Sequence, residues 1–466
     1  MELPLSFKNA MKALLGEEYD DLIRSYDDIP YSAIRINTSK ISVSDFEKIA
    51  PFEIKKIPFV DNGYYINETD KWAKHPYYHA GLYYIQEPSA MYAASLLPVS
   101  SEDIVLDLCA APGGKSTFLA TRAPGLLISN DISRSRTMPL VKNLEHFGTG
   151  NFAVTCEDPS KLSDIYRDRF DRILVDAPCS GEGMFRRDNK LISSYLQKGP
   201  EYYSPIQRDI LESAYKMLRP GGSLLYLTCT FSDIEDEQVI CSFLDDHHDM
   251  KVCPIPQQYG LRGPYDKYRD DPKLSGVVHA LPHRFGGEGH FMALMTRDHV
   301  DSDRKVIADL KYTVYDRLPD GVKDLAGLFS DSYMEYFINR KFLTAKDGYI
   351  YILPDHFEDF YEKGIRYSRT GTCIGNVNGS GRFAVHTALA LSIRETDHKN
   401  VLSFAADDPA VLKYLKGETL TFGREDAACD LKKGYVLVCV EHFPLGFAKY
   451  DGKKLKNLYE KGWIYS

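Results

Sequence analysis

Two of the nine cysteines stand where a thiol could do chemistry. Cys179 follows a predicted buried strand in the segment Asp-Ala-Pro-Cys-Ser-Gly, and Cys229 follows another in Thr-Cys-Thr. A lone cysteine at a strand end is usually a small buried hydrophobic residue. Here the polar loops, and strand ends that would lie about 5 Å apart in a sheet, favour a functional pair. One thiolate could add to an aromatic ring while a second group completes the reaction, as carbon methylation of a pyrimidine requires.

A loop of small residues precedes this pair in the chain. It runs over 109–115 as Cys-Ala-Ala-Pro-Gly-Gly-Lys, between an apolar run and a predicted helix. Small residues let the backbone approach a ligand, and a helix start offers free N–H groups. A phosphate loop needs glycine six residues before its lysine, where this chain has Cys109, and Gly-x-Gly-x-x-Gly is absent. An ATP or dinucleotide site is therefore disfavoured, and a glycine turn that only packs against a helix is the other alternative.

Three acidic residues end successive predicted strands: Asp131, Asp158 and Asp176. A carboxylate after the second strand can accept hydrogen bonds from both hydroxyls of a ribose. Asp158 could meet the amino group of an adenine. Each residue alone is equally explained by the preference of Asp for turns. Three in succession favour a nucleoside ligand.

The elements around these motifs predict the fold. Residues 100–295 alternate apolar strands with helices, with strands expected at 104–108, 126–131, 152–155, 172–176 and 223–227. A helix over 210–218 should stop at the Arg-Pro-Gly-Gly of 219–222. Near-continuous apolar strands separated by helices predict an α/β fold with a parallel sheet covered on both faces. Such sheets bind ligands at the carboxyl ends of their strands, where all the motifs fall.

Length and composition indicate several domains in one chain of 466 residues. We expect a small α/β lead-in module at 1–95, the sheet domain at 96–297, a charged linker at 296–305, a small α+β module at 306–390 and a strand-rich module at 395–466. No apolar run reaches 18 residues and no secretory signal is seen, so a cytoplasmic protein without a membrane span is expected. No cysteine or histidine spacing suggests a metal site. The net charge of −9 argues against a globally basic nucleic-acid binder but allows local basic patches.

The motifs together resemble a known family. Segments 106–115, 176–181 and 228–230 are similar to the RNA 5-methylcytosine methyltransferases of the RsmB and NOL1/NOP2/Sun family. Segments 84–91 and 287–291 look like the same family, so the likeness covers roughly residues 30–295. The tail at 443–449 and 455–462 resembles the PUA-like RNA-binding module of the ribosomal RNA branch called RsmF. Asp131 is a departure, because other members carry Glu there.

The resemblance implies a Rossmann-like class I methyltransferase sheet, S-adenosylmethionine as cofactor and small-subunit ribosomal RNA as substrate, with the protein acting as a monomer. It implies cofactor contacts from Cys109, Ala110, Ala111, Pro112, Gly113, Gly114, Lys115, Asp131, Asp158 and Asp176. It makes Cys229 the nucleophile, through a covalent bond to C6 of cytosine, and gives Cys179 a part in product release.

The chemistry explains why such groups are needed. C5 of cytosine is a poor nucleophile until a thiolate has added to C6. That addition places charge on N3 and O2, which needs a nearby donor. Asp176 is our candidate for N3. The target base must be flipped out or unpaired to reach the site.

RNA contacts are expected from local basic patches. The expected residues are Lys449, Lys453, Lys454, Lys456 and Lys461 beside Tyr450, Tyr459 and Trp463 in the tail, Arg186 and Arg187 after the Cys179 loop, and Arg35 and Asn37 in the lead-in module. Each set could equally be a solvated surface.

Two other functions stay open. A transfer RNA cytosine-C5 methyltransferase would carry the same catalytic motifs, and only the tail favours ribosomal RNA. A noncatalytic ribosome-assembly factor that retains the fold would be expected to lose a chemical group, yet all are present in this sequence.

Overall fold

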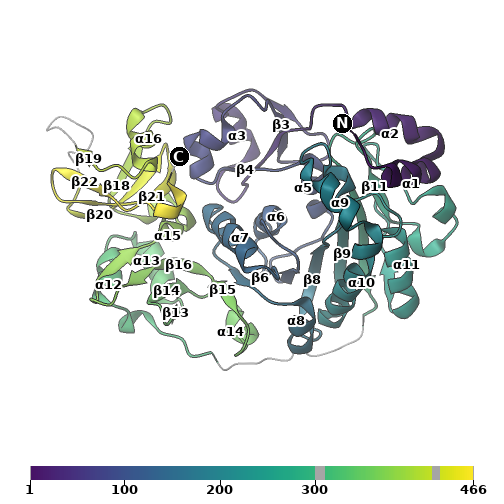
Figure 1. The fold of residues 1–466 in the computed structure, drawn as a ribbon. Coiled ribbons are helices and arrows are strands. Elements are labelled where there is room, and N and C mark those ends of the chain that lie inside the picture. The colour runs from purple at the N-terminus through teal and green to yellow at the C-terminus, as the bar shows by residue number, and fades with distance from the viewer. Residues whose placement is uncertain (1, 300–309, 422–430, 465–466) are drawn as a thin grey trace.

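The computed structural model describes residues 2–299, 310–421 and 431–464. Its largest sheet has the strand order β10-β12-β9-β8-β5-β6-β7-β15, with β11 paired to β12 (Figure 1). The strands are β5 (Ile104–Asp107), β6 (Leu126–Asn130), β7 (Phe152–Thr155), β8 (Phe170–Asp176), β9 (Leu218–Thr228), β10 (Met250–Val252), β11 (Val278–Ala280), β12 (His290–Arg297) and β15 (Tyr367–Thr370). The five from β9 to β7 run parallel. The predicted parallel α/β sheet is confirmed, with antiparallel strands added at both edges.

Helices cover both faces of this sheet because its strands are apolar on both sides. One face packs against α5 (Pro88–Ser95), α6 (Gly114–Ala120) and α7 (Arg134–His146). The other packs against α8 (Pro159–Ile165), α10 (Pro200–Met217) and α11 (Glu237–Asp246). Side chains alternate along β5, where Val105 joins the first core and Leu106 the second. None of the described helices is both long and apolar enough to cross a bilayer.

The N-terminal part forms its own four-stranded sheet, in the order β2-β3-β1-β4. Its elements are α1 (Leu5–Leu15), α2 (Tyr19–Ser25), β1 (Ala33–Ile36), α3 (Val43–Ile49), β2 (Ile54–Lys56), β3 (Gly63–Ile66), α4 (Pro76–His79) and β4 (Tyr83–Ile85). The expected amphipathic helix is present, because Phe7, Met11 and Leu14 are buried on one side of α1. They pack against Phe185 and Phe231, which lie close in sequence to the two cysteines.

The C-terminal half contains two further sheets. One has the order β13-β14-β16-β17 and the other β18-β20-β21-β22-β19. The elements are α12 (Asp320–Ala326), α13 (Asp331–Ile338), β13 (Phe342–Thr344), β14 (Tyr349–Ile352), α14 (Phe357–Phe360), β16 (Thr372–Val377), β17 (Phe383–Val385), α15 (Thr387–Ser392), β18 (Val401–Phe404), α16 (Pro409–Leu415), β19 (Leu420–Thr421), β20 (Gly434–Val440), β21 (Phe443–Tyr450) and β22 (Lys454–Asn457). The remaining helix, α9 (Lys190–Gln197), belongs to the central domain.

The two ends of the chain meet in one hydrophobic core. Ile34 of β1 and Phe46 of α3 share it with Val411 of α16 and Val436 of β20, and Figure 1 shows α3 beside α16. The module at 306–390 is also joined to the large sheet, because β15 pairs antiparallel with β7. The C-terminal modules therefore pack against the N-terminal module and the central domain.

Some element boundaries differ from those expected. Helix α10 begins at Pro200, ten residues before the predicted start, because its first turns bury Ser204 and Gln207 as well as apolar residues. Strand β9 starts at Leu218 and runs through the Pro-Gly-Gly segment, with a register shift against β8. The expected charged linker lies mostly outside the described residues, and its first two residues belong to β12.

Candidate functional site

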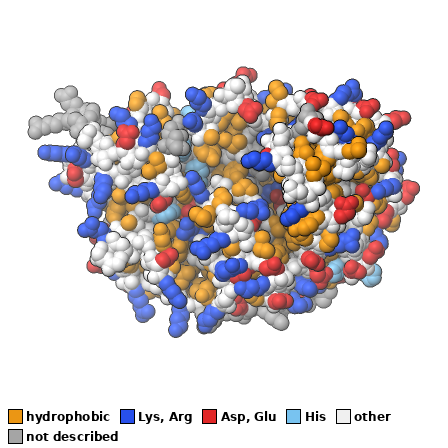
Figure 2. All heavy atoms as spheres, viewed as in Figure 1, with side chains coloured by type: hydrophobic (Ala, Val, Ile, Leu, Met, Phe, Trp, Pro, Cys, Tyr) orange, Lys and Arg blue, Asp and Glu red, His pale blue; other side chains and the backbone are white. Residues whose placement is uncertain are grey.

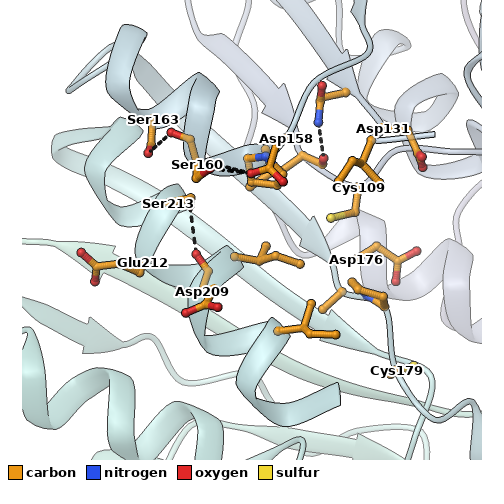
Figure 3. A pocket seen from close by; sticks show the side chains of 18 of the residues that line it. Cys109, Asp131, Asp158, Ser160, Ser163, Asp176, Cys179, Asp209, Glu212 and Ser213 are labelled. Carbon is orange, nitrogen blue, oxygen red and sulfur yellow. Dashed lines mark hydrogen bonds between the residues drawn. The ribbon is translucent and has the colours of Figure 1, made fainter. Parts of the chain in front are cut away.

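A cavity of about 780 Å³ opens at the carboxyl ends of the parallel strands. Figure 3 shows Cys109, Asp131 and Asp176 together on one side and residues of α8 and α10 on the other. Strand-end residues in its wall include Cys109, Asp131, Asp158, Asp176, Cys179 and Cys229. The cavity therefore collects the two cysteines and all three strand-end acids. This is the edge where a doubly covered parallel sheet binds ligands.

The two cysteines are in contact. The β8–β9 register pairs Asp176 with Leu227, so both cysteine loops leave the sheet at the same edge. The Sγ atoms of Cys179 and Cys229 lie 3.2 Å apart. The hydrogen bond with Cys229, together with burial, holds the pKa of Cys179 well above its usual range. Either sulfur can be the donor of this hydrogen bond.

An ion pair stands beside the cysteines. Lys115 Nζ lies 2.7 Å from Asp176 Oδ2, with side chains 10 % and 32 % exposed. Burial works against the ammonium form, but the Asp176 carboxylate and then the Cys229 sulfur raise the pKa of Lys115. Lys115 thus remains a cation within electrostatic reach of the nucleophile candidate. The sequence assigned Lys115 only to cofactor binding, and the structure adds this contact.

The cofactor side of the cavity is rich in hydrogen-bonding groups. Asp131 is buried, with Oδ1 accepting from the Ser133 amide at 2.9 Å and Oδ2 lying 3.4 Å from Arg136. Asp158 is exposed and caps α8 by accepting from the Ser160 amide. Gly113 has a φ of +112°, which L side chains rarely adopt, so glycine is required there. Within the glycine loop, Cys109 lies in the cavity wall, whereas contacts from residues 110–115 to a cofactor stay a prediction.

These residues fit a nucleoside-bearing cofactor such as S-adenosylmethionine. The cavity volume falls in the range of small-molecule sites. Asp131 and Asp158 offer carboxylates for ribose hydroxyls and an adenine amino group, and Ile132 and Pro159 give apolar cavity wall between them. The free backbone groups at the start of α6 suit a polar end of the ligand.

A buried glutamate that the sequence reading missed joins the two cysteine loops. Glu235 Oε2 accepts from the Ser180 amide at 3.0 Å and from Gln207 Nε2 at 2.8 Å. Gln207 Nε2 also donates to the Pro178 carbonyl at 2.9 Å. Ser180 Oγ lies 2.7 Å from Thr230 Oγ1, which ties one loop to the other. The acidic run at 233–237 is the only feature of the sequence that points to this glutamate, and such a run is equally typical of a helix start.

Glu182 and His290 are two further buried groups at this edge. Glu182 accepts from the Phe231 amide at 2.8 Å, and burial raises the pKa of both Glu182 and Glu235 to about 7. His290 precedes the Phe291–Thr228 pair of β12 and β9, which places it next to Cys229 in the sheet. Its Nδ1 lies 2.8 Å from Ser89 Oγ, which donates to Glu87 at 2.6 Å. The sequence reading assigned none of these residues a role.

One buried group could in principle hold a metal ion. Ligand atoms of Asp236, Glu237 and His279 lie within 4.8 Å of one another. Thr228 donates to Asp236 at 2.6 Å and His279 Nε2 lies 2.9 Å from Glu237, whereas Asp236 Oδ2, Glu237 Oε2 and His279 Nδ1 are buried without a hydrogen-bond partner. We interpret the group as a buried hydrogen-bond network under Cys229.

The structure corrects two predicted RNA contacts in the N-terminal module. Arg35 is fully buried and donates to the Gly114 carbonyl at 3.1 Å and to Thr117 Oγ1 at 2.8 Å. Asn37 is fully buried and donates to the carbonyls of Gly81 and Phe147. Both side chains join the N-terminal module to the central domain, and burial leaves them no surface for RNA.

The two arginines after the Cys179 loop, Arg186 and Arg187, differ in their exposure. Arg186 is 3 % exposed, pairs with Glu288 and donates to the Ser25 carbonyl at 3.0 Å, so its predicted RNA contact is also not supported. Arg187 pairs with the same carboxylate at 3.1 Å but keeps 29 % of its side chain exposed. An RNA contact by Arg187 stays a prediction.

The tail lysines are exposed as expected, while two of their aromatic neighbours are not. Lys449 and Lys456 lie opposite each other on β21 and β22, Lys453 lies in the turn between these strands, and Lys454 begins β22, all of them exposed. Tyr459 and Trp463 are 5 % and 9 % exposed, so they offer little stacking surface. Figure 2 shows Lys and Arg side chains spread over these C-terminal modules.

The sheet, its strand-end cavity and the paired thiols define a methyltransferase with a Rossmann-like sheet. Comparison with family models agrees over three consecutive segments. Residues 3–88 match the N-terminal domain of 16S rRNA methyltransferase RsmF, residues 94–296 match 16S rRNA methyltransferase RsmB/F, and residues 401–465 match the methyltransferase RsmF PUA domain.

Relatives match over nearly the whole chain. Ribosomal RNA small subunit methyltransferase F of Shewanella oneidensis is 30 % identical, covering 91 % of this chain and 89 % of its own. The protein of the same name from Escherichia coli is 29 % identical, covering 97 % and 94 %. The chain therefore belongs to the RsmB/F family of 16S rRNA methyltransferases, in its RsmF branch.

Solved structures support the fold. A methyltransferase homolog from Pyrococcus horikoshii is 27 % identical with a TM-score of 0.55, covering 63 % of this chain and 94 % of its own. NSun6 from the same organism, solved with the S-adenosylmethionine analogue SFG, is 21 % identical with a TM-score of 0.51, covering 63 % and 98 %. At that identity the second likeness shows the fold alone.

Proposed function

We propose that the protein uses S-adenosylmethionine to methylate C5 of a cytosine in small-subunit ribosomal RNA. The observation that carries this proposal is the Cys179–Cys229 contact at the mouth of a nucleoside-sized cavity, beside the Lys115–Asp176 ion pair. Family membership supports the substrate class. Mass spectrometry of a small-subunit RNA transcript, after incubation with the protein and labelled cofactor, tests it by locating the methyl group on cytosine C5.

The residues divide the chemical work as follows. The Cys229 thiolate adds to C6 of the cytosine and makes C5 nucleophilic. Bound S-adenosylmethionine supplies the methyl group as an electrophile. Cys179 stays close enough to act on the covalent adduct and help release the product. The methyl donor leaves as its thioether, and the C5 proton must pass to a base, for which Cys179 is our candidate, before Cys229 can be expelled.

The charge on the ring needs a partner in the site. Asp176 remains our candidate for a contact to N3, and Lys115 adds an ammonium donor 2.7 Å from its carboxylate. A cation near developing negative charge at N3 and O2 stabilises the adduct in a site that excludes water. The thiols are only partly exposed, so the target base must leave its helix or be unpaired to reach them.

Glu235 is expected to position both cysteine loops. Replacing it with Ala removes the acceptor for the Ser180 amide and Gln207, so the thiols should lose their relative placement. We expect the Glu235→Ala variant to lose about 100-fold in kcat, the scale of a misplacement near 1 Å, while cofactor affinity changes little. Single-turnover methyl transfer and calorimetry measure the two quantities.

The matched control is Glu235→Gln, which keeps a carbonyl oxygen at the same place. It should retain most of kcat, because a neutral amide can still accept both hydrogen bonds. A Glu235→Ala enzyme with wild-type kcat would show that the hydrogen bonds to Glu235 do not position the cysteine loops.

The tail lysines are expected to contact phosphates. Replacing Lys453, Lys454 and Lys456 together with Gln should lower the slope of log affinity against log salt by about 2, because each phosphate contact contributes about 0.7 to 0.9. RNA affinity across a salt series measures this slope. The control is the Lys8→Gln, Lys12→Gln variant on α1, whose slope should remain near wild type. An unchanged slope in the tail variant would mean that its lysines are only solvated.

We further propose that the protein acts as a monomer in the cytoplasm, without a metal ion or a membrane. A transfer RNA substrate is the alternative, and methyl transfer to transfer RNA instead of small-subunit RNA would favour it. The N-terminal and PUA family matches support the ribosomal substrate.

A further inference from the structure

A second cavity, of about 1020 Å³, lies along the outer face of α7. Its walls include Arg134, Met138 and Lys142 of α7, Tyr349 of β14, residues 366–369 at β15 and Trp463. The four-residue spacing on α7 puts its three side chains on one face of the helix. Residues 132 and 136 of the same helix start line the catalytic cavity, so the two cavities flank the beginning of α7.

Two cations in this second cavity have no carboxylate partner in the described part of the chain. Arg134 and Lys142 are exposed and stand eight residues apart, about 12 Å along the helix. Lys142 Nζ lies 3.3 Å from the Gly462 carbonyl and 5.9 Å from the centre of the Trp463 ring. Partial burial lowers the pKa of Lys142. A cation without a counter-charge is favourably placed to receive an anion.

The acidic groups of the cavity are partly neutralised by the protein itself. Glu145 is 2 % exposed and lies 2.8 Å from Arg369, and burial raises the pKa of Glu145 to about 7. Glu460 lies 3.8 Å from His386, but burial lowers the pKa of His386 to about 3, so this neutral imidazole leaves the Glu460 charge uncompensated. Asp347 remains as an exposed carboxylate in the lining. The lining therefore carries the Asp347 and Glu460 carboxylates as well as the two cations of the α7 wall.

A tyrosine offers a flat surface opposite these cations. Tyr349 and Tyr351 are stacked, with ring centroids 6.4 Å apart and planes inclined by 20°. Arg369 lies over the Tyr351 ring at 5.4 Å and holds that ring in place. Tyr349 is half-buried and lines the cavity. Nucleic-acid bases stack on such rings without sequence preference.

We propose that this second cavity binds a single-stranded segment of the RNA substrate, away from the target cytosine. Arg134 and Lys142 pair with phosphates, and Tyr349 stacks on a base. Cations without partners next to a tyrosine ring match the chemistry of a single strand better than that of an apolar protein surface. The inference rests on the proposed function, because it assigns the segment to the same RNA.

The position of the cavity links this contact to the catalytic site. Arg136, on the first turn of α7, donates to the Ala111 carbonyl of the glycine loop at 2.8 Å and lies 3.4 Å from Asp131. RNA bound along α7 would therefore contact the same helix that, through Arg136, contacts the glycine loop and Asp131. The contact adds affinity for RNA and leaves the reacting groups untouched.

The test compares RNA binding by two surface variants of equal charge. Arg134→Gln with Lys142→Gln removes the two cations of the cavity, and Lys8→Gln with Lys12→Gln removes two cations from α1, at the opposite end of the molecule in Figure 1. Affinity is measured with an unmodified small-subunit RNA transcript over a salt series. We expect the cavity variant alone to bind about tenfold more weakly, with the salt slope lowered by about 1.4 for two single-strand phosphate contacts.

The stacking contact has its own pair of variants. Tyr349→Ala should weaken RNA binding by about fivefold or more, whereas Tyr349→Phe keeps the ring and should bind as wild type. In the α7 cavity variant and in Tyr349→Ala, we expect KM for RNA to rise while kcat at saturating RNA is unchanged. If Tyr349→Ala fails to fold, the surface pair on α7 still decides the proposal.

Several outcomes would overturn the proposal. Unchanged affinity and salt slope in the cavity variant would do so, as would equal weakening in the α1 variant, which would indicate only general electrostatics. A defect on assembled subunits but not on naked transcript would assign the cavity to a protein. Failure of the proposed function is separable, because the wild-type protein would then transfer no methyl group to cytosine.

Discussion

The Cys229→Ala variant is expected to lose methyl transfer to RNA while it still binds S-adenosylmethionine within a few-fold of the wild-type affinity. Addition to C6 requires a thiolate. The cavity wall holds two other cysteines: Cys179, which is assigned to product release, and Cys109 of the glycine loop, whose pKa is raised well above its usual range by burial. Loss of a covalent nucleophile costs orders of magnitude, so the rate should fall below about 1 % of wild type. Labelled-methyl transfer to a small-subunit RNA transcript measures the rate, and calorimetry measures cofactor affinity.

A control separates the chemistry from general damage to the fold. Cys241→Ala removes a half-buried thiol on α11, outside the lining of the catalytic cavity, and should transfer methyl groups normally. Transfer by Cys229→Ala at more than a few per cent of the wild-type rate would remove Cys229 as the nucleophile. Loss of cofactor binding in that variant would instead indicate that the strand end itself had been disturbed.

The Cys179→Ala variant is expected to accumulate a covalent protein–RNA adduct. Cys229 can still add to the base in this variant, but the thiol 3.2 Å away that is assigned to product release is missing. The adduct should appear as a slowly migrating band on a denaturing gel with labelled RNA and cofactor. Normal turnover without such a band would refute the division of labour between the two thiols.

The double variant Cys179→Ala, Cys229→Ala is the decisive control for this adduct. The double variant lacks the thiol assigned to the C6 bond, and Cys109 is the only cysteine left in the described cavity wall, so the slowly migrating band should disappear. A band that persisted in the double variant would place the covalent bond on another residue. The paired experiments therefore test which sulfur forms the bond and which one helps to break it.

The large sheet and the place of its site could be read from the sequence because both depend on local patterns. Apolar runs such as 104–108 and 172–176 end in polar loops, and consecutive strands of this kind form a parallel sheet with its ligands at one edge. The position of α10 was harder to predict. Its first turns are held by buried polar contacts such as Gln207 to Glu235, which have no apolar periodicity.

The RNA-binding predictions were weaker for a related reason. Arg35, Asn37 and Arg186 have the side chains that a phosphate contact needs, but residue type does not report burial. Their partners are the Gly114 and Phe147 carbonyls and the Glu288 carboxylate, which lie between 79 and 110 residues away in the chain. Only tertiary packing decides whether such a group faces solvent or joins two modules.

The sequence by itself determined the chemistry available to this protein: two cysteines at strand ends, a glycine loop and three strand-end acids. These are local features, and adjacent parallel strands bring their ends together in a predictable way. The tertiary structure decided the rest. It joined Glu235 to both cysteine loops, set Lys115 against Asp176 and built a cavity from α7, β14 and the chain end. Because those contacts join residues far apart in the chain, they depend on burial and packing, and no local sequence pattern predicts them.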